Sequence, residues 1–153
     1  MKILVSACLL GDNVRWNGSN KESIFLKNWA EENGIELQPV CPEDELYGTP
    51  RGTIKLIQIE DKTLVVMGEK NITEELNSKC QEIHERHSDA SGFIGIYGSP
   101  SCGISVGVKN KGGMTKGIMH SSASIPTTEI GHFKNDNSRK NFLRKAKKEK
   151  TDA

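Results

Sequence analysis

The chain has 153 residues, a formal net charge of +1 and 35% hydrophobic residues. This length suits one domain with a substantial core, and the near-neutral charge argues against a globally basic nucleic-acid-binding protein. The N-terminal apolar run is too short for a signal peptide and no segment reaches membrane-spanning length, so we expect a cytoplasmic protein whose four cysteines stay reduced.

The first third of the chain predicts a strand–helix–strand unit. Residues 2–6 form a short apolar run that is typical of a buried strand. Ser19 and Glu22 have the spacing of a capping box, which predicts a helix that ends near Gly34. Residues 35–40 form the second strand, and two strands joined in this way lie parallel with a right-handed connection.

The middle of the chain predicts a hairpin and a second helix. Residues 54–60 and 63–67 alternate apolar and polar side chains, which is typical of an antiparallel hairpin. Asn71 is the expected N-cap of the helix that follows. Cys80 lies on the apolar stripe of this helix, and we interpret it as an ordinary core residue.

The last third predicts one more buried strand at residues 93–97 and a basic C-terminal helix. Between them we expect a flexible stretch at 106–113, a helix at 114–123 and an extended segment at 125–129. Lysine and arginine dominate residues 137–150, where the apolar side chains that can contact the domain are Phe142, Leu143 and Ala146.

Alternation of strands and helices favours an α/β fold. We therefore predict a single domain with a mostly parallel sheet, flanking helices and a small antiparallel hairpin. The domain is expected to cover residues 1–130, and residues 131–153 are expected to form a basic C-terminal helix or tail.

Three of the cysteines follow the predicted strands at 2–6, 35–40 and 93–97. They are Cys8, Cys41 and Cys102, and each lies at the start of a turn. The carboxyl ends of parallel strands meet at one edge of a sheet, and ligands bind in the crevice above that edge. We therefore expect the three thiols to converge on one site.

The residues alone leave four interpretations of these cysteines open. In the first, they are unrelated core residues. In the second, Cys8, Gly11 and Arg15 form a phosphate-binding loop of a phosphatase with a thiolate nucleophile, although the spacing between the cysteine and the arginine is longer than usual. A structural zinc site is a third possibility, but the paired ligands that such sites favour are missing. The fourth is an iron–sulfur cluster, in which three thiolates leave one iron open as a Lewis acid.

Four sequence blocks together resemble the thiouracil desulfidase family. The resemblance runs from about Met1 to Met119. The blocks are Ser6-Ala7-Cys8-Leu9-Leu10-Gly11 with Val14-Arg15, Val40-Cys41-Pro42-Glu43, Thr49-Pro50-Arg51, and Ser99-Pro100-Ser101-Cys102-Gly103. The resemblance implies a [4Fe-4S] cluster held by Cys8, Cys41 and Cys102, with one open iron that accepts sulfur from a thiolated pyrimidine. It also implies that Glu43 and Ser99 are catalytic.

From this resemblance we expect non-redox desulfuration of thiouracil, or of 4-thiouridine as nucleoside or monophosphate. Glu43 would act as a base or proton shuttle, and Ser99 would position water or pass a proton. Ser101 and Arg15 are the expected substrate-binding residues. Longer relatives with a second domain act on thiolated RNA, and because that domain is missing here we expect a small free substrate.

Two further side chains have alternative interpretations. Trp16 either stacks on a base or packs at the rim of the site, and Arg51 either binds the substrate or is an ordinary solvated charge. The alternative function is a structural metal-binding module that contacts RNA through its basic tail.

Overall fold

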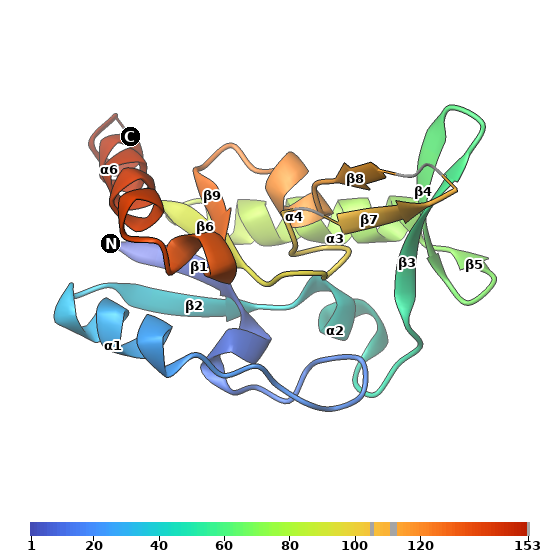
Figure 1. Ribbon diagram of the computed structural model, residues 1–153, viewed down its shortest axis with the longest axis horizontal. Coiled ribbons are helices and arrows are strands. Elements are labelled where there is room, and N and C mark those ends of the chain that lie inside the picture. Colours follow the sequence, from blue (N-terminus) through green and yellow to red (C-terminus); the bar gives the residue numbers. More distant parts are fainter. Residues whose placement is uncertain (105, 111–112, 153) are drawn as a thin grey trace.

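The computed structural model describes residues 1–104, 106–110 and 113–152 (Figure 1). Its first sheet, sheet A, is fully parallel and has the strand order β2-β1-β6-β9. The strands are β1 (Lys2–Ser6), β2 (Glu36–Val40), β6 (Gly92–Gly95) and β9 (Thr127–Glu129). The predicted α/β fold with a mostly parallel sheet is confirmed.

A second, mixed sheet, sheet B, has the strand order β5-β4-β3-β7-β8. Its strands are β3 (Ile54–Ile59), β4 (Lys62–Met67), β5 (Lys70–Asn71), β7 (Val106–Lys109) and β8 (Gly113–Thr115). The pair β3–β4 is the predicted antiparallel hairpin, which is confirmed as part of this larger sheet.

The predicted flexible stretch at 106–113 is wrong over residues 106–109, and residues 111–112 of it lie outside the described part of the chain. Val106 and Val108 are buried in β7, which pairs with β3 from much earlier in the sequence. The predicted helix at 114–123 is also wrong at its start, where β8 extends the sheet. Only Ile118–Ser121 is helical, as α4.

The helices cover the two faces of sheet A. They are α1 (Ile24–Glu32), α2 (Pro42–Tyr47), α3 (Thr73–Arg86), α4, α5 (Ile130–Phe133) and α6 (Asp136–Asp152). In β1, Ile3 and Val5 pack in one core cluster with α1, α5 and α6, whereas Leu4 packs in the other with α3 and α4. Burial on both faces explains why the three central residues of this strand, Ile3, Leu4 and Val5, are all apolar.

The predicted start of the first helix is wrong. Helix α1 begins after Ser23, whose hydroxyl accepts a hydrogen bond from the backbone N–H of Leu26. The preceding segment is instead tied to the 3-10 helix η1 (Ala7–Leu10), because Lys21 N–H donates to the carbonyl of Cys8 at 2.9 Å. This tertiary contact outweighs the local capping preference. Cys80, by contrast, is fully buried in the core as expected.

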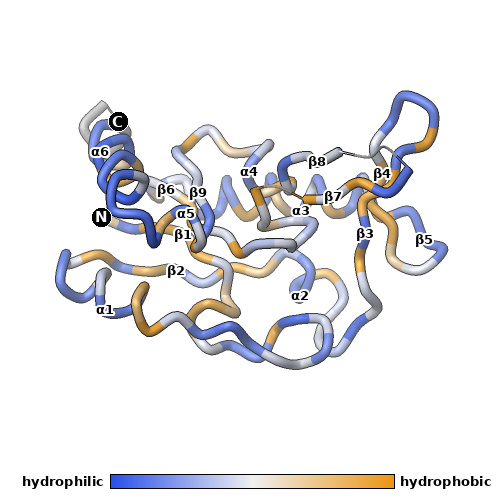
Figure 2. The backbone as a smooth tube through the Cα atoms, in the orientation of Figure 1, coloured by the Kyte–Doolittle hydropathy of each residue, from blue (hydrophilic) through white to orange (hydrophobic). Residues whose placement is uncertain are grey.

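The C-terminal segment forms the expected basic helix and docks on the domain. Phe142 and Ala146 are buried, and the ring of Phe142 lies 6.3 Å from that of Phe133. The remaining side chains described in α6 are mostly exposed and hydrophilic (Figure 2). None of the helices in the described ranges is long and apolar enough to cross a membrane.

Gly95 joins sheet A to the loop that carries Cys102. A Cβ atom at this position would overlap the carbonyl oxygen of Cys102, and it would also lie 2.9 Å from His120 Nε2. Backbone atoms cannot move aside as a flexible side chain can. The close approach of strand and loop therefore requires glycine here.

We predict that Gly95→Ala lowers the free energy of unfolding by about 3 kcal/mol, at the upper end of overpacking effects. Gly107→Ala is the matched control, because Gly107 lies in β7 and a Cβ atom there would have no neighbour within 4 Å. It should change stability by less than about 0.5 kcal/mol. Urea unfolding monitored by circular dichroism measures both, and equal effects would contradict the close contact.

Candidate functional site

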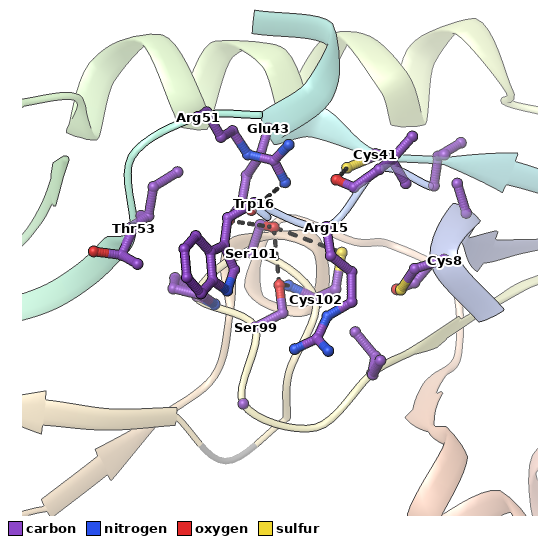
Figure 3. A pocket seen from close by; sticks show the side chains of 18 of the residues that line it. Cys8, Arg15, Trp16, Cys41, Glu43, Arg51, Thr53, Ser99, Ser101 and Cys102 are labelled. Atoms are coloured by element: carbon purple, nitrogen blue, oxygen red, sulfur yellow. Dashed lines mark hydrogen bonds and ion pairs between the residues drawn. The ribbon is translucent and has the colours of Figure 1, made fainter. Parts of the chain in front are cut away.

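A cavity of about 410 Å³ lies at the carboxyl ends of β1, β2 and β6 (Figure 3). The chain leaves β1 to form β2 on one side, whereas β6 pairs with β1 on the other. Such a reversal of strand order opens a crevice at the strand ends. Cys8, Cys41 and Cys102 all line this cavity, and Cys80 does not.

Local structure fixes Cys8 and Cys41 at their strand ends. Cys8 lies in η1, which ends at Gly11 in a left-handed conformation with φ of 95°. Cys41 is the N-cap of α2, and Pro42 begins that helix. The Cys41 sulfur accepts a hydrogen bond from the backbone N–H of Asp44 at 3.4 Å. Both thiols are therefore held by the backbone at the start of a helical turn.

The third cysteine is held by hydrogen bonds on both sides of its loop. The backbone N–H of Cys102 donates to the Ser99 hydroxyl at 3.1 Å. His120 Nε2 lies 2.7 Å from the Cys102 carbonyl oxygen, which can only accept, so this nitrogen carries the proton. Burial lowers the pKa of His120 and keeps its ring neutral. The loop is thereby held by His120, a residue that does not line the cavity.

All four cysteines are free thiols. Burial raises the pKa of Cys41 to about 11 and of Cys102 to about 12, because a thiolate is poorly solvated there. Burial also raises the pKa of Cys8, and the positive charge of Arg15 opposes this effect. The Cys102 sulfur lies 3.6 Å from the Ser101 hydroxyl oxygen, and because Ser101 directs its own proton at Glu43, the thiol donates this hydrogen bond. A metal group that binds these sulfurs must therefore displace protons.

The spacing of potential ligands bears on the kind of metal group. Among the described residues, no three His, Cys, Asp or Glu side chains are grouped closely enough to hold one metal ion. A single zinc ion would bring its sulfur ligands within about 5 Å of one another, given Zn–S bonds of about 2.3 Å. In an iron–sulfur cluster each cysteine binds a separate iron, so the sulfurs lie farther apart.

A buried hydrogen-bond chain crosses the same cavity. Ser101 donates its hydroxyl proton to Glu43 Oε1 at 3.2 Å, and Arg51 Nη2 pairs with Glu43 Oε2 at 3.2 Å. The Ser99 hydroxyl lies 3.3 Å from that of Ser101. Since the Ser101 proton is directed at Glu43, the Ser99 hydroxyl donates to Ser101. Both oxygens of the carboxylate are thus held in place, as the dashed lines in Figure 3 show.

Glu43 is both an acidic residue in the first turn of a helix and a residue of the cavity. It lies in the first turn of α2, where an acidic side chain is favoured by the helix dipole. It is also buried and lines the cavity. A carboxylate that served only the helix would stay in solvent, whereas this one is buried against Arg51 and Ser101 at the cavity.

The default interpretation of Arg51 as a solvated charge is wrong. Its side chain is only 4% exposed, and Nη1 donates to the carbonyl of Gly48 and the hydroxyl of Thr49. Its sequence signal was a lone arginine between a proline and a glycine, which indicates a special turn but not a partner. The partner, Glu43, is distant enough in sequence that only the fold reveals the pair.

The other two basic or aromatic candidates also lie at the cavity. Arg15 is half-buried and Trp16 is half-exposed, and both line it. Ser99, Ser101 and Glu43 line the same cavity as the three thiols, whereas Gly11, the glycine of the alternative phosphatase loop, does not. Ser6, which belongs to the first of the four sequence blocks, and Thr53, to which no motif pointed, also line the cavity.

Two comparisons relate this architecture to other proteins. The chain is similar to the solved structure of a [4Fe-4S]-dependent thiouracil desulfidase, TudS, with a TM-score of 0.67 and 22% sequence identity. The match covers 87% of this chain and 93% of that one, and at this identity it shows a shared fold. A comparison with curated proteins finds no match.

The family assignment comes from the sequence itself. A family model described as 2-thiouracil desulfurase matches residues 3–130, which include η1, α2 and the Cys102 loop. This range covers most of the chain and all residues that line the cavity. The chain therefore belongs to the 2-thiouracil desulfurase family.

Proposed function

We propose that the protein is an enzyme that removes sulfur from thiolated pyrimidines by hydrolysis. The observation that carries this proposal is the meeting of three free thiols and the Ser99–Ser101–Glu43 chain in one cavity. Family membership supports it, as does the shared fold with a [4Fe-4S]-dependent thiouracil desulfidase. Water supplies the new oxygen and the sulfur leaves as sulfide, so the reaction needs no electron donor or acceptor.

Cys8, Cys41 and Cys102 are the residues that would hold a [4Fe-4S] cluster. They fit it because each thiol is free, lies at a strand end and faces the same cavity. The positive charge of Arg15 favours the Cys8 thiolate, the form of cysteine that such a cluster requires. Bound by three cysteines, the cluster supplies an open iron, a Lewis acid with affinity for soft sulfur.

Glu43 is the proposed general base. Ser101 and Arg51 hold its two oxygens, so the carboxylate keeps one orientation toward the cavity. It would take a proton from the water that attacks the thiocarbonyl carbon. Ser99, less buried than Ser101, would position that water and return a proton to the departing sulfide through the hydroxyl pair.

The cavity also limits the substrate. Its volume of about 410 Å³ would have to hold the cluster together with the substrate, which favours a compound no larger than a single nucleotide. We propose 2-thiouracil, or 4-thiouridine as nucleoside or monophosphate, as the substrate class, with Arg15 and Ser101 as the residues that bind it. We also propose that the enzyme works in the cytoplasm, where its free thiols stay reduced.

We predict that anaerobic reconstitution with iron and sulfide gives a brown protein that releases sulfide from 2-thiouracil or 4-thiouridine monophosphate. Cys102→Ala should lose both the visible absorption and the activity, because one of three ligands is removed. Cys80→Ala is the matched control, since Cys80 is equally buried but lies outside the cavity. Iron content, absorption and sulfide release measure the outcome. Bound iron with no desulfuration of either compound would contradict the enzymatic proposal.

We predict that Glu43→Gln keeps the iron content of the wild type but lowers kcat by roughly 10²- to 10⁴-fold, the usual loss for a general base. Glu45→Gln is the control, because Glu45 lies in the same helix and pairs with Arg86 outside the cavity. It should keep near-normal turnover. A kcat for Glu43→Gln close to that of the control would rule out Glu43 as the base.

A further inference from the structure

Trp16 is an exposed aromatic residue at the mouth of the cavity. The described part of the chain exposes six large hydrophobic side chains, and of these only Trp16 and Tyr97 line the cavity. Trp16 is 46% exposed. Half-exposure of an indole leaves a large apolar surface in water, and a binding site is the place where such a surface is useful.

The backbone around Trp16 is held firmly. Its carbonyl accepts a hydrogen bond from the backbone N–H of Arg51 at 3.0 Å, next to the side chain that pairs with Glu43. The carbonyl of Arg15 accepts from Gly18 N–H at 2.7 Å, and Gly18 has a φ of 80° that favours glycine. The turn is therefore tied to the wall of the cavity that carries the proposed base.

The indole itself has no ring partner in the described ranges. The aromatic and cation–π contacts found there involve other rings, chiefly those of Phe25, Phe133 and Tyr47. Figure 3 shows the indole across the front of the cavity, between Arg15 and Thr53. A flat aromatic face thus borders a cavity that is lined by thiols, hydroxyls, charged groups and aliphatic side chains such as those of Val14, Ile54 and Ile96.

We propose that Trp16 is the stacking platform for the pyrimidine ring of the substrate, a proposal that rests on the function proposed above. Stacking takes up the apolar faces of a heterocycle and leaves its polar edges free for Arg15 and the serine hydroxyls. The site then selects planar aromatic rings over non-planar compounds with the same polar edges. Uracil and 5,6-dihydrouracil differ in this way, since only uracil has a flat conjugated ring.

The test compares the reconstituted wild type with Trp16→Leu and Trp16→Phe. Leucine keeps an apolar side chain at this position but has no aromatic ring, whereas phenylalanine keeps an aromatic ring that is smaller than the indole. Trp16→Leu should raise KM for 2-thiouracil by roughly 5- to 150-fold, the loss expected for one stacked base, with little change in kcat. Trp16→Phe should recover most of the affinity.

As inhibitors, uracil should bind the wild type more tightly than 5,6-dihydrouracil does, and Trp16→Leu should abolish this preference.

Tryptophan fluorescence gives a readout that does not depend on turnover. Uracil should change the emission of the wild type but not that of Trp16→Phe, whose remaining tryptophan, Trp29, lies in the core. Ile24→Ala is the control, because Ile24 is 58% exposed on α1 and does not line the cavity. Its KM should equal that of the wild type.

The outcomes separate this proposal from the proposed function. Normal desulfuration with an unchanged KM in Trp16→Leu would overturn the stacking role alone. A KM that rises in Tyr97→Leu but not in Trp16→Leu would overturn it as well. If the wild type desulfurates no thiolated pyrimidine, the function fails, and the uracil-dependent fluorescence of wild type against Trp16→Phe still decides whether Trp16 binds the ring.

Discussion

The parallel pairing of β2, β1 and β6 is the constraint on which the rest of the site depends. Parallel strands leave the sheet at the same edge, so the turns after them must lie side by side. Each of these turns carries one cysteine, and two of them begin a helical segment that fixes the thiol. Residues far apart in the sequence therefore face one cavity without any local motif that contains all three.

The cavity wall contains a buried ion pair between Glu43 and Arg51, and neither charge would be stable there without the other. Glu43 loses water when it packs inside, and Arg51 and Ser101 replace that water with an ion pair and a hydrogen bond. Arg51 is in turn held by Gly48, Thr49 and the carbonyl of Trp16. Removal of the Arg51 side chain would leave the Glu43 carboxylate buried without its ion-pair partner, whereas the backbone of Arg51 would still hold the Trp16 turn.

The features predictable from sequence were those with a local cause. Apolar runs that end in turn residues located β1, β2 and β6, and they placed the three cysteines at strand ends. Residues 106–109 were missed as a strand because their alternation is too short to recognise and their partner β3 is distant. The cap at Ser23 and the burial of Arg51 likewise depend on contacts with Leu9, Cys8 and Glu43 that only the folded chain provides. Local signals thus located the three cysteines, whereas tertiary contacts decided which polar groups surround them.

The central claim is that Cys8, Cys41 and Cys102 together hold one iron–sulfur cluster. The most direct measurement is anomalous diffraction at the iron absorption edge from crystals of the anaerobically reconstituted protein. We expect one compact group of iron peaks in the cavity, bonded to these three sulfur atoms and not to Cys80. Iron bound elsewhere, or a single ion held by fewer than three of these cysteines, would contradict the claim.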